Sequence, residues 1–177
     1  METEVKISIT NEELTGVRER LALLEAEKIS GCSMEINSLY DFEDGRLMQA
    51  GCVLRVRRYE GSTILTFKGP TDPGSMYKKR RELETAVQDA AAIDDILKAL
   101  GMSICFEYRK LRETYTVSVA SSMTEVCIDQ TPAGVFVEVE GEEPGIQAVL
   151  QKFGWTSERF VNKTYVEIYR EHPEREP

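Results

Sequence analysis

Charged and apolar residues alternate along many short segments of this chain, and that alternation restricts its fold more than any other feature. At the N-terminus, for example, Glu2, Glu4 and Lys6 are separated by Thr3 and Val5. Successive side chains of a β-strand point to opposite faces, so such a segment folds as a strand with one charged and one apolar face. The same pattern predicts strands at about 2–9, 33–41, 52–59, 62–68, 80–87, 104–109, 110–119, 124–130, 135–141 and 162–169. The segments 104–109 and 110–119 are also consistent with one long strand.

Three other segments repeat their apolar residues with the period of an α-helix, at about 10–28, 88–100 and 144–153. A capping-box pattern opens the first at Thr10, and a glycine follows the second and the third. Many antiparallel strands with three helices predict an α+β domain built on a large sheet or barrel. The loop 69–79 is rich in proline and glycine, and we expect it to form a mobile flap over a site.

Several predicted strands place two like charges on one face, two residues and therefore roughly 6.5–7 Å apart. The pairs are Glu2/Glu4, Arg55/Arg57, Glu82/Glu84 and Glu138/Glu140. An ordinary sheet with its charged face in water is the simplest interpretation, but like charges repel unless opposite charges lie between them. If the sheet instead closes with its apolar face outward beneath the helices, the charges line a lumen. Such a lumen suits a polyanion bound with divalent cations, because carboxylates bind Mg²⁺ or Mn²⁺ and basic groups bind phosphate oxygens.

The amino-acid composition argues against several classes of function. The 177 residues suffice for one domain, and 22 Lys and Arg against 31 Asp and Glu disfavour binding to nucleic acid or to an anionic membrane. No apolar run approaches the ~18 residues of a membrane span, and the N-terminus lacks the pattern of a signal peptide, so we expect a cytoplasmic protein. The four cysteines form no C-x-x-C motif, and the single histidine, His172, lies near the C-terminus, so catalysis must rest on carboxylates, Lys and Arg.

The signature E-x-E-x-K stands at Glu2–Lys6, and further motifs follow in order along nearly the whole chain. These are L-Y-D at 39–41, L-R-V-R at 54–57, L-T-F-K-G-P at 65–70, R-E-L-E at 81–84, K-L-R at 110–112, I-D at 128–129, G-V-F-V-E-V-E at 134–140 and K-T-Y at 163–165. In these motifs the chain resembles the CYTH superfamily, also called triphosphate tunnel metalloenzymes. The resemblance implies a closed antiparallel barrel of about eight strands around a charged tunnel, with helices packed on the outside. It would cover 1–169 as a single domain, with 170–177 as a flexible tail.

The resemblance also implies roles for individual residues. The implied metal ligands, direct or through water, are Glu2, Glu4, Asp129, Glu138 and Glu140. The residues implied to bind the triphosphate are Lys6, Arg55, Arg57, Lys68, Arg80, Lys110, Arg112 and Lys163. Lys6, Glu4 and Glu140 are the predicted catalytic residues.

Some of these positions allow a second interpretation. Asp129 could be a hairpin residue, and Glu82 and Glu84 could orient the basic groups without binding metal. Tyr40 and Tyr165 are expected in the core, with contact to the organic end of a substrate as the alternative.

By the same resemblance, we expect an enzyme dependent on Mg²⁺ or Mn²⁺ that acts on ATP, thiamine triphosphate or tripolyphosphate. Hydrolysis is slightly favoured over cyclisation of ATP to cyclic AMP and pyrophosphate, since no adenine-reading motif is evident. A non-catalytic module that binds polyphosphate or nucleotide is the alternative from another class. The sequence is compatible with a homodimer.

Overall fold

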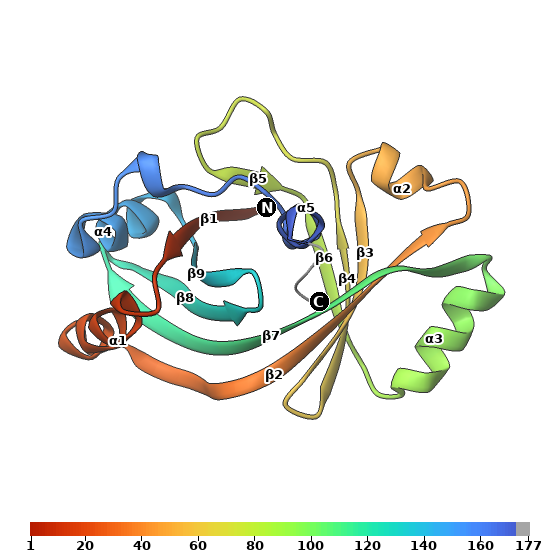
Figure 1. Cartoon of the computed structure of the whole chain (residues 1–177), viewed down its shortest axis with the longest axis horizontal. Helices are drawn as coiled ribbons and strands as arrows, with labels where there is room; N and C mark the ends of the chain where they lie inside the picture. Colours follow the sequence, from red (N-terminus) through yellow and green to blue (C-terminus); the bar gives the residue numbers. More distant parts are fainter. Residues whose placement is uncertain (173–177) are drawn as a thin grey trace.

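In a computed structural model that describes residues 1–172, the chain folds into one nine-stranded antiparallel sheet with helices around it (Figure 1). The strands lie in the order β5-β1-β9-β8-β7-β2-β3-β4-β6. The strands are β1 (Glu2–Ile9), β2 (Glu27–Phe42), β3 (Val53–Tyr59), β4 (Ser62–Lys68), β5 (Lys78–Arg80), β6 (Glu82–Val87), β7 (Met102–Val119), β8 (Ser122–Thr131) and β9 (Gly134–Glu140). The helices are α1 (Glu13–Leu23), α2 (Arg46–Gln49), α3 (Ala90–Ala99), α4 (Glu143–Phe153), the 3₁₀ turn η1 (Ser157–Arg159) and α5 (Tyr165–Glu171).

The two edges of the sheet are bridged by one segment of chain. Strands β5 and β6 stand at opposite ends of the strand order, yet only Arg81 separates them in the sequence. In β5, Arg80 lies opposite Glu2 of β1, and in β6, Glu82 lies opposite Lys68 of β4. The sheet is therefore nearly closed, which confirms the predicted α+β barrel.

The apolar face of the barrel points outward, and three helices cover it. Helices α1 and α4 pack on one part of this face, where Ile7 and Val137 are fully buried, and α3 packs on another, above Val56 (Figure 1). Each buried side chain of this kind stabilises the fold by roughly 1.5–3 kcal/mol. The alternating charges of the same strands then face inward, and Glu2 and Glu4 retain only 6% and 7% of their accessible surface.

The predicted helices are confirmed within a few residues, and β7 is the single long strand that the sequence allowed. The first helix is shorter than predicted, because it ends at Leu23 and β2 already begins at Glu27. The loop between β4 and β5 lies over the cavity described below, as expected of a flap. Its mobility stays a prediction.

The predicted strand at 162–169 is wrong, because this segment forms α5. Val166, Glu167 and Ile168 imitate the alternation of a strand, but Thr164 and Glu167 form a complete capping box that starts a helix. Helix α5 also differs from the other helices in position. The Tyr165 side chain of α5 packs against Tyr108 and other lumen-facing residues. Helix α5 therefore lies inside the opening of the barrel and not on the outer face (Figure 1).

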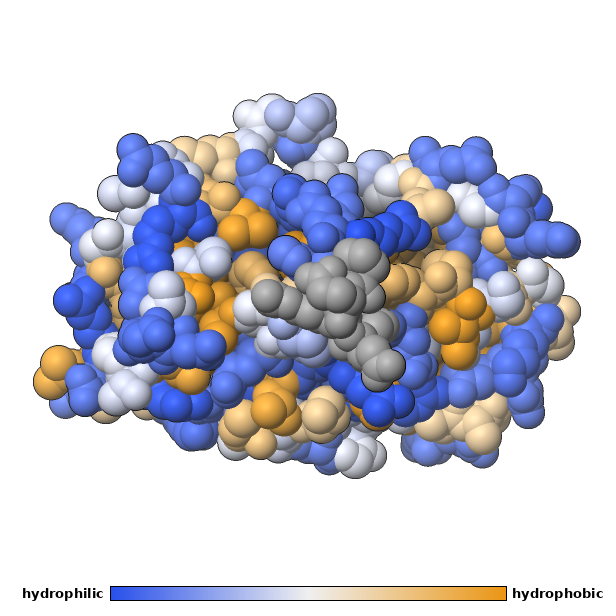
Figure 2. Space-filling view, in the orientation of Figure 1, coloured by the Kyte–Doolittle hydropathy of each residue, from blue (hydrophilic) through white to orange (hydrophobic). Residues whose placement is uncertain are grey.

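Arg170 and Glu171, which the prediction assigns to the tail, belong to α5, while 173–177 lie outside the described residues. Hydrophilic residues predominate on the face shown in Figure 2, and its apolar residues gather in separate small groups. None of the helices in the described part of the chain is long and apolar enough to cross a membrane.

Candidate active site

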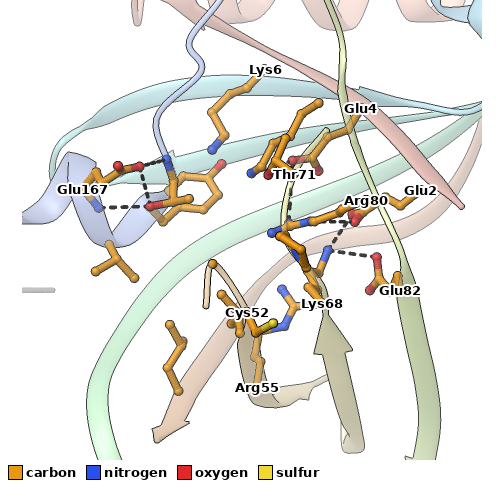
Figure 3. A pocket seen from close by; sticks show the side chains of 18 of the residues that line it. Glu2, Glu4, Lys6, Cys52, Arg55, Lys68, Thr71, Arg80, Glu82 and Glu167 are labelled. Carbon is orange, nitrogen blue, oxygen red and sulfur yellow. Dashed lines mark hydrogen bonds and ion pairs between the residues drawn. The ribbon is translucent and has the colours of Figure 1, made fainter. Parts of the chain in front are cut away.

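The inward-facing charges surround a cavity of about 1140 Å³ (Figure 3). Strands from all around the barrel contribute to its wall, and the loop at 70–77 forms part of its rim. The predicted site residues that line it are Glu2, Glu4, Lys6, Arg55, Arg57, Lys68, Arg80, Lys110, Arg112, Glu138 and Glu140. The lumen inferred from the like-charge pairs therefore exists, and it brings most of the candidate residues together.

Three carboxylates converge on one side of this cavity. Oxygen atoms of Glu2, Glu4 and Glu140 lie within 4.8 Å of one another, and we call these residues the acid cluster. Two of its members have basic partners. Glu2 pairs with Lys68 at 2.5 Å and with Arg80 at 3.0 Å, as drawn in Figure 3, and Glu4 pairs with Lys78 at 2.9 Å. Burial, followed by the negative charge of Glu2, raises the pKa of Glu140 to about 7. Convergent carboxylate oxygens of this kind fit a hard divalent cation such as Mg²⁺ or Mn²⁺.

Basic side chains of β3 and β7 form the opposite side, and we call Arg55, Arg57, Lys110 and Arg112 the basic wall. Arg55 is buried, yet its nearest partner is the Thr66 hydroxyl at 3.5 Å, and its Nε has no hydrogen-bond partner among residues 1–172. Buried donors without partners cost free energy that an anion can recover. Arg55 is therefore poised to bind phosphate oxygens.

Asp129 does not line the cavity, and its carboxylate lies behind the basic wall. It accepts hydrogen bonds from Lys110 at 2.9 Å, from Arg112 at 2.6 Å through each of two nitrogens, and from the Tyr165 hydroxyl at 2.6 Å. All of these contacts are buried, with Asp129 itself 0% exposed. Asp129 therefore supports the basic wall and is not part of the acid cluster. This position differs from the metal-binding role predicted for Asp129.

Glu138 is also separated from the acid cluster by its neighbours. It pairs with Arg112, and more loosely with Lys6 at 3.5 Å and Lys110 at 3.9 Å. Burial alone would raise the pKa of Glu138, but the charges of Lys110 and Arg112 hold that pKa well below its usual range. Glu138 is thus a firmly ionised acid that neutralises the basic groups around it.

Glu82 and Glu84 make the contacts that the orienting alternative requires. Glu82 pairs with Lys68 at 3.0 Å, and Glu84 pairs with Arg57 at 3.3 Å. Both acids therefore hold basic side chains at the cavity wall.

Lys163, like Asp129, is a predicted site residue that does not line the cavity. Its side chain is 54% exposed, pairs with Glu171 at 2.7 Å and does not line the cavity. The predicted strand phase put this side chain in the lumen, and that phase fails because the segment leads into α5. Only its backbone reaches the site, where the Lys163 carbonyl accepts a hydrogen bond from Lys6 at 3.1 Å.

Sequence reasoning missed Lys78, which lines the cavity, and Glu35, which lies beside the basic wall. Glu35 is fully buried beside Lys110 at 3.3 Å, and Lys78 pairs with Glu4 at 2.9 Å. Glu35 could have been found, because it shares a strand face with Asn37 in a predicted strand. Lys78 stood in a segment predicted as loop, so no periodicity pointed to it.

Comparison with known proteins places these features in a family. The model of the CYTH domain matches residues 1–165. A proposed adenylate cyclase of Methanocaldococcus jannaschii is 27% identical over 126 residues, which cover 65% of this chain and 69% of that protein. The crystal structure of a proposed adenylate cyclase from Vibrio parahaemolyticus superposes with a TM-score of 0.80 at 20% identity, covering 96% and 97% of the two chains.

A proposed adenylyl cyclase of Hippeastrum has the same fold, with a TM-score of 0.69 at 14% identity over 97% of this chain and 96% of that one. The family match spans the acid cluster, the basic wall and the start of α5. This chain belongs to the CYTH family.

Proposed function

We propose that this protein is a divalent-metal-dependent enzyme that binds a triphosphate in the cavity and cleaves it by hydrolysis. The observation that carries the proposal is the presence of the acid cluster and the basic wall in a single cavity. A site that only bound anions would gain nothing from converging carboxylates. The Hippeastrum protein, which shares the fold, has a dominant triphosphatase activity, and this supports hydrolysis.

Phosphoryl transfer requires positioning and charge neutralisation more than covalent participation by the protein. The basic wall and Lys6 would hold the phosphate oxygens. The buried Asp129 and the half-buried Glu138 would keep Lys110 and Arg112 in place. Glu2, Glu4 and Glu140 would hold the cation. When bound, the cation would neutralise charge on the phosphate and acidify the attacking water.

Cyclisation of ATP is the second candidate, and the named activity of the Methanocaldococcus relative favours it. In that reaction the ribose 3′-hydroxyl attacks the α-phosphorus and pyrophosphate leaves. The cavity has an uncharged wall that includes Leu39, Phe106 and Tyr108, against which an organic group could pack. Both reactions would use the same basic wall, and they differ in which phosphorus faces a nucleophile.

A product assay separates these reactions. The protein is incubated with tripolyphosphate, thiamine triphosphate or ATP, each with Mg²⁺ or Mn²⁺, and the products are separated by chromatography. We expect inorganic phosphate and the corresponding diphosphate. Cyclic AMP and pyrophosphate from ATP would support cyclisation instead, and binding of all three compounds without cleavage would identify a non-catalytic module.

Arg55→Ala is expected to raise KM at least about tenfold for every triphosphate tested, because a hydrogen bond to a charged group contributes roughly 1.5–3 kcal/mol. The effect should not depend on the organic group, since Arg55 reads phosphate. Arg58→Ala is the matched control from the same strand. Its side chain faces outward and pairs with Asp94, so its loss should lower stability and leave KM unchanged. A change in KM for one substrate alone would contradict this assignment.

A further inference from the structure

Two lysines of the proposed site meet at one aromatic ring. The ammonium group of Lys6 lies 3.9 Å from the centroid of the Tyr165 ring, and that of Lys110 lies 4.5 Å from the same centroid. Lys6 comes from β1, Lys110 from β7 and Tyr165 from the first turn of α5, so the contact joins three distant parts of the chain. All three side chains are buried and line the cavity.

The two ammonium groups repel each other, and the carboxylate that they share, Glu138, lies 3.5 Å from Lys6 and 3.9 Å from Lys110. They carry like charges in a buried site, where the repulsion is screened less than in water. An aromatic face attracts cations electrostatically, and this attraction increases when the cation is desolvated. The Tyr165 ring therefore offsets part of the repulsion between Lys6 and Lys110, and it does so without the net negative charge that would also repel a polyanion.

Lys6 depends on this segment more than Lys110 does. Its ammonium group donates a hydrogen bond of 3.1 Å to the carbonyl of Lys163, two residues before Tyr165, while its carboxylate partner Glu138 is 3.5 Å away. An ammonium group has three donors, so Lys6 keeps donors that can turn to a ligand. The segment that begins α5 thus fixes the position of Lys6 without neutralising it.

Lys110 is held by Tyr165 in a second way. The Tyr165 hydroxyl donates a hydrogen bond of 2.6 Å to Asp129, and the same carboxylate oxygen accepts from Lys110 at 2.9 Å. Burial, followed by the charge of Asp129, raises the pKa of Tyr165 well above its usual range, so the phenol stays protonated and remains a donor.

We propose that Tyr165 is a positioning residue that holds Lys6 and Lys110 at the spacing needed to bind a triphosphate. This inference rests on the proposed function of the cavity. It gives α5 a role in the site, since the helix delivers a ring that both lysines contact.

The test uses two variants of Tyr165 and a matched control on the same helix. Tyr165→Leu removes the ring, and Tyr165→Phe keeps the ring and removes the hydroxyl. Tyr169→Leu is the control, because Tyr169 is also buried and its hydroxyl donates to the backbone carbonyl of Arg109, at 2.6 Å, and not to Asp129. We expect Tyr165→Leu to raise KM for tripolyphosphate about tenfold with a smaller change in kcat, as loss of two desolvated cation–π contacts predicts.

Tyr165→Phe should retain most of the affinity, and Tyr169→Leu should lower the melting temperature without changing KM. Equal KM values for Tyr165→Leu and Tyr169→Leu would overturn the proposal, because the effect would then be one of packing. If Tyr165→Leu does not fold, the KM of Tyr165→Phe and the NMR spectrum of the unmodified protein decide the question.

A spectroscopic readout needs no substrate and therefore separates this inference from the proposed function. In protein labelled with ¹³C-lysine, the ring current of Tyr165 should shift the ε-methylene signals of Lys6 and Lys110 upfield. Tyr165→Leu should abolish both shifts, while Tyr165→Phe and Tyr169→Leu preserve them. Absence of both shifts in the unmodified protein would overturn the inference, whereas failure to cleave any triphosphate with the shifts present would overturn only the proposed function.

Discussion

Replacing Glu140 by glutamine is expected to lower metal-dependent cleavage at least about 100-fold, because loss of even an outer-shell partner of a metal ligand costs 10–100-fold. In the same variant the metal-free protein should become more stable above neutral pH. Both effects arise because the Glu140 carboxylate lies among other carboxylates. Glu140 faces Glu2 and Glu4 of β1 and Glu125 of β8, with Lys68 of β4 as the nearby compensating charge.

The sign of the stability effect follows from the raised pKa of Glu140, about 7 against an ordinary 4.5. Below pH 4.5 the carboxyl is protonated in both the folded and the unfolded protein and has no effect on stability. Between pH 4.5 and 7 the unfolded protein ionises this carboxyl while the folded protein keeps it protonated, so stability falls over this range and the loss is complete above pH 7. A neutral glutamine removes this loss.

Melting temperatures of the metal-free protein at about pH 4 and about pH 8.5 measure the difference. Glu140→Gln should match the unmodified protein at the lower pH and exceed it at the higher. Glu19→Gln, at an exposed position of α1, controls for the loss of one negative charge. Full activity of Glu140→Gln with Mg²⁺, or equal melting temperatures at both pH values, would contradict the assignment of the acid cluster.

Asp129→Ala is expected to destabilise the metal-free protein by about 3–5 kcal/mol, the range for removing one partner of a buried ion pair. Lys110 would lose its closest carboxylate, Arg112 would lose the carboxylate that binds two of its nitrogens, and Tyr165 would lose its acceptor. Unfolding in urea, followed by circular dichroism, measures the change in free energy. Asp95→Ala is the control, since the Asp95 side chain is 81% exposed and should have little effect.

The same variant separates a supporting role from metal binding. If Asp129 supports the basic wall, tripolyphosphate without metal should restore part of the lost stability, because its oxygens supply negative charge to Lys110 and Arg112. Ligand present at about a hundredfold over its Kd contributes ~2.7 kcal/mol. If Asp129 instead binds the cation, stability without metal should change little and the affinity for Mg²⁺ should fall sharply.

Local alternation was sufficient to predict most of the barrel. Glu2, Glu4 and Lys6 face the lumen because the period of a strand is two, and no tertiary contact can change that parity while β1 stays a strand. The same reasoning failed at Lys163, where Val166 and Ile168 matched a strand as well as a helix. Only the capping box that starts at Thr164 distinguishes the helix from a strand, and this motif covers just four residues.

The burial of a charged side chain and the identity of its neighbours cannot be predicted from such patterns. Glu138 and Glu140 are two residues apart on one face of β9, yet the pKa of Glu138 is lowered and the pKa of Glu140 is raised. The difference arises from which residues of β1 and β7 lie beside each carboxylate, and this depends on strand order and register. A sequence pattern identifies a charged face, whereas the division of that face into acid cluster and basic wall is a property of the assembled barrel.

The short segment that bridges β5 and β6 also bears on how the protein avoids self-association. Sheet edges with free backbone groups can pair with another chain, and natural proteins block this with inward-pointing charges on their edge strands. When β5 and β6 detach, β1 and β4 become the edges, and they carry Glu2, Glu4 and Lys68 on their inner face. Residues assigned here to cation and phosphate binding would then hinder edge-to-edge aggregation of the opened barrel, so selection for solubility and selection for the site act on the same side chains.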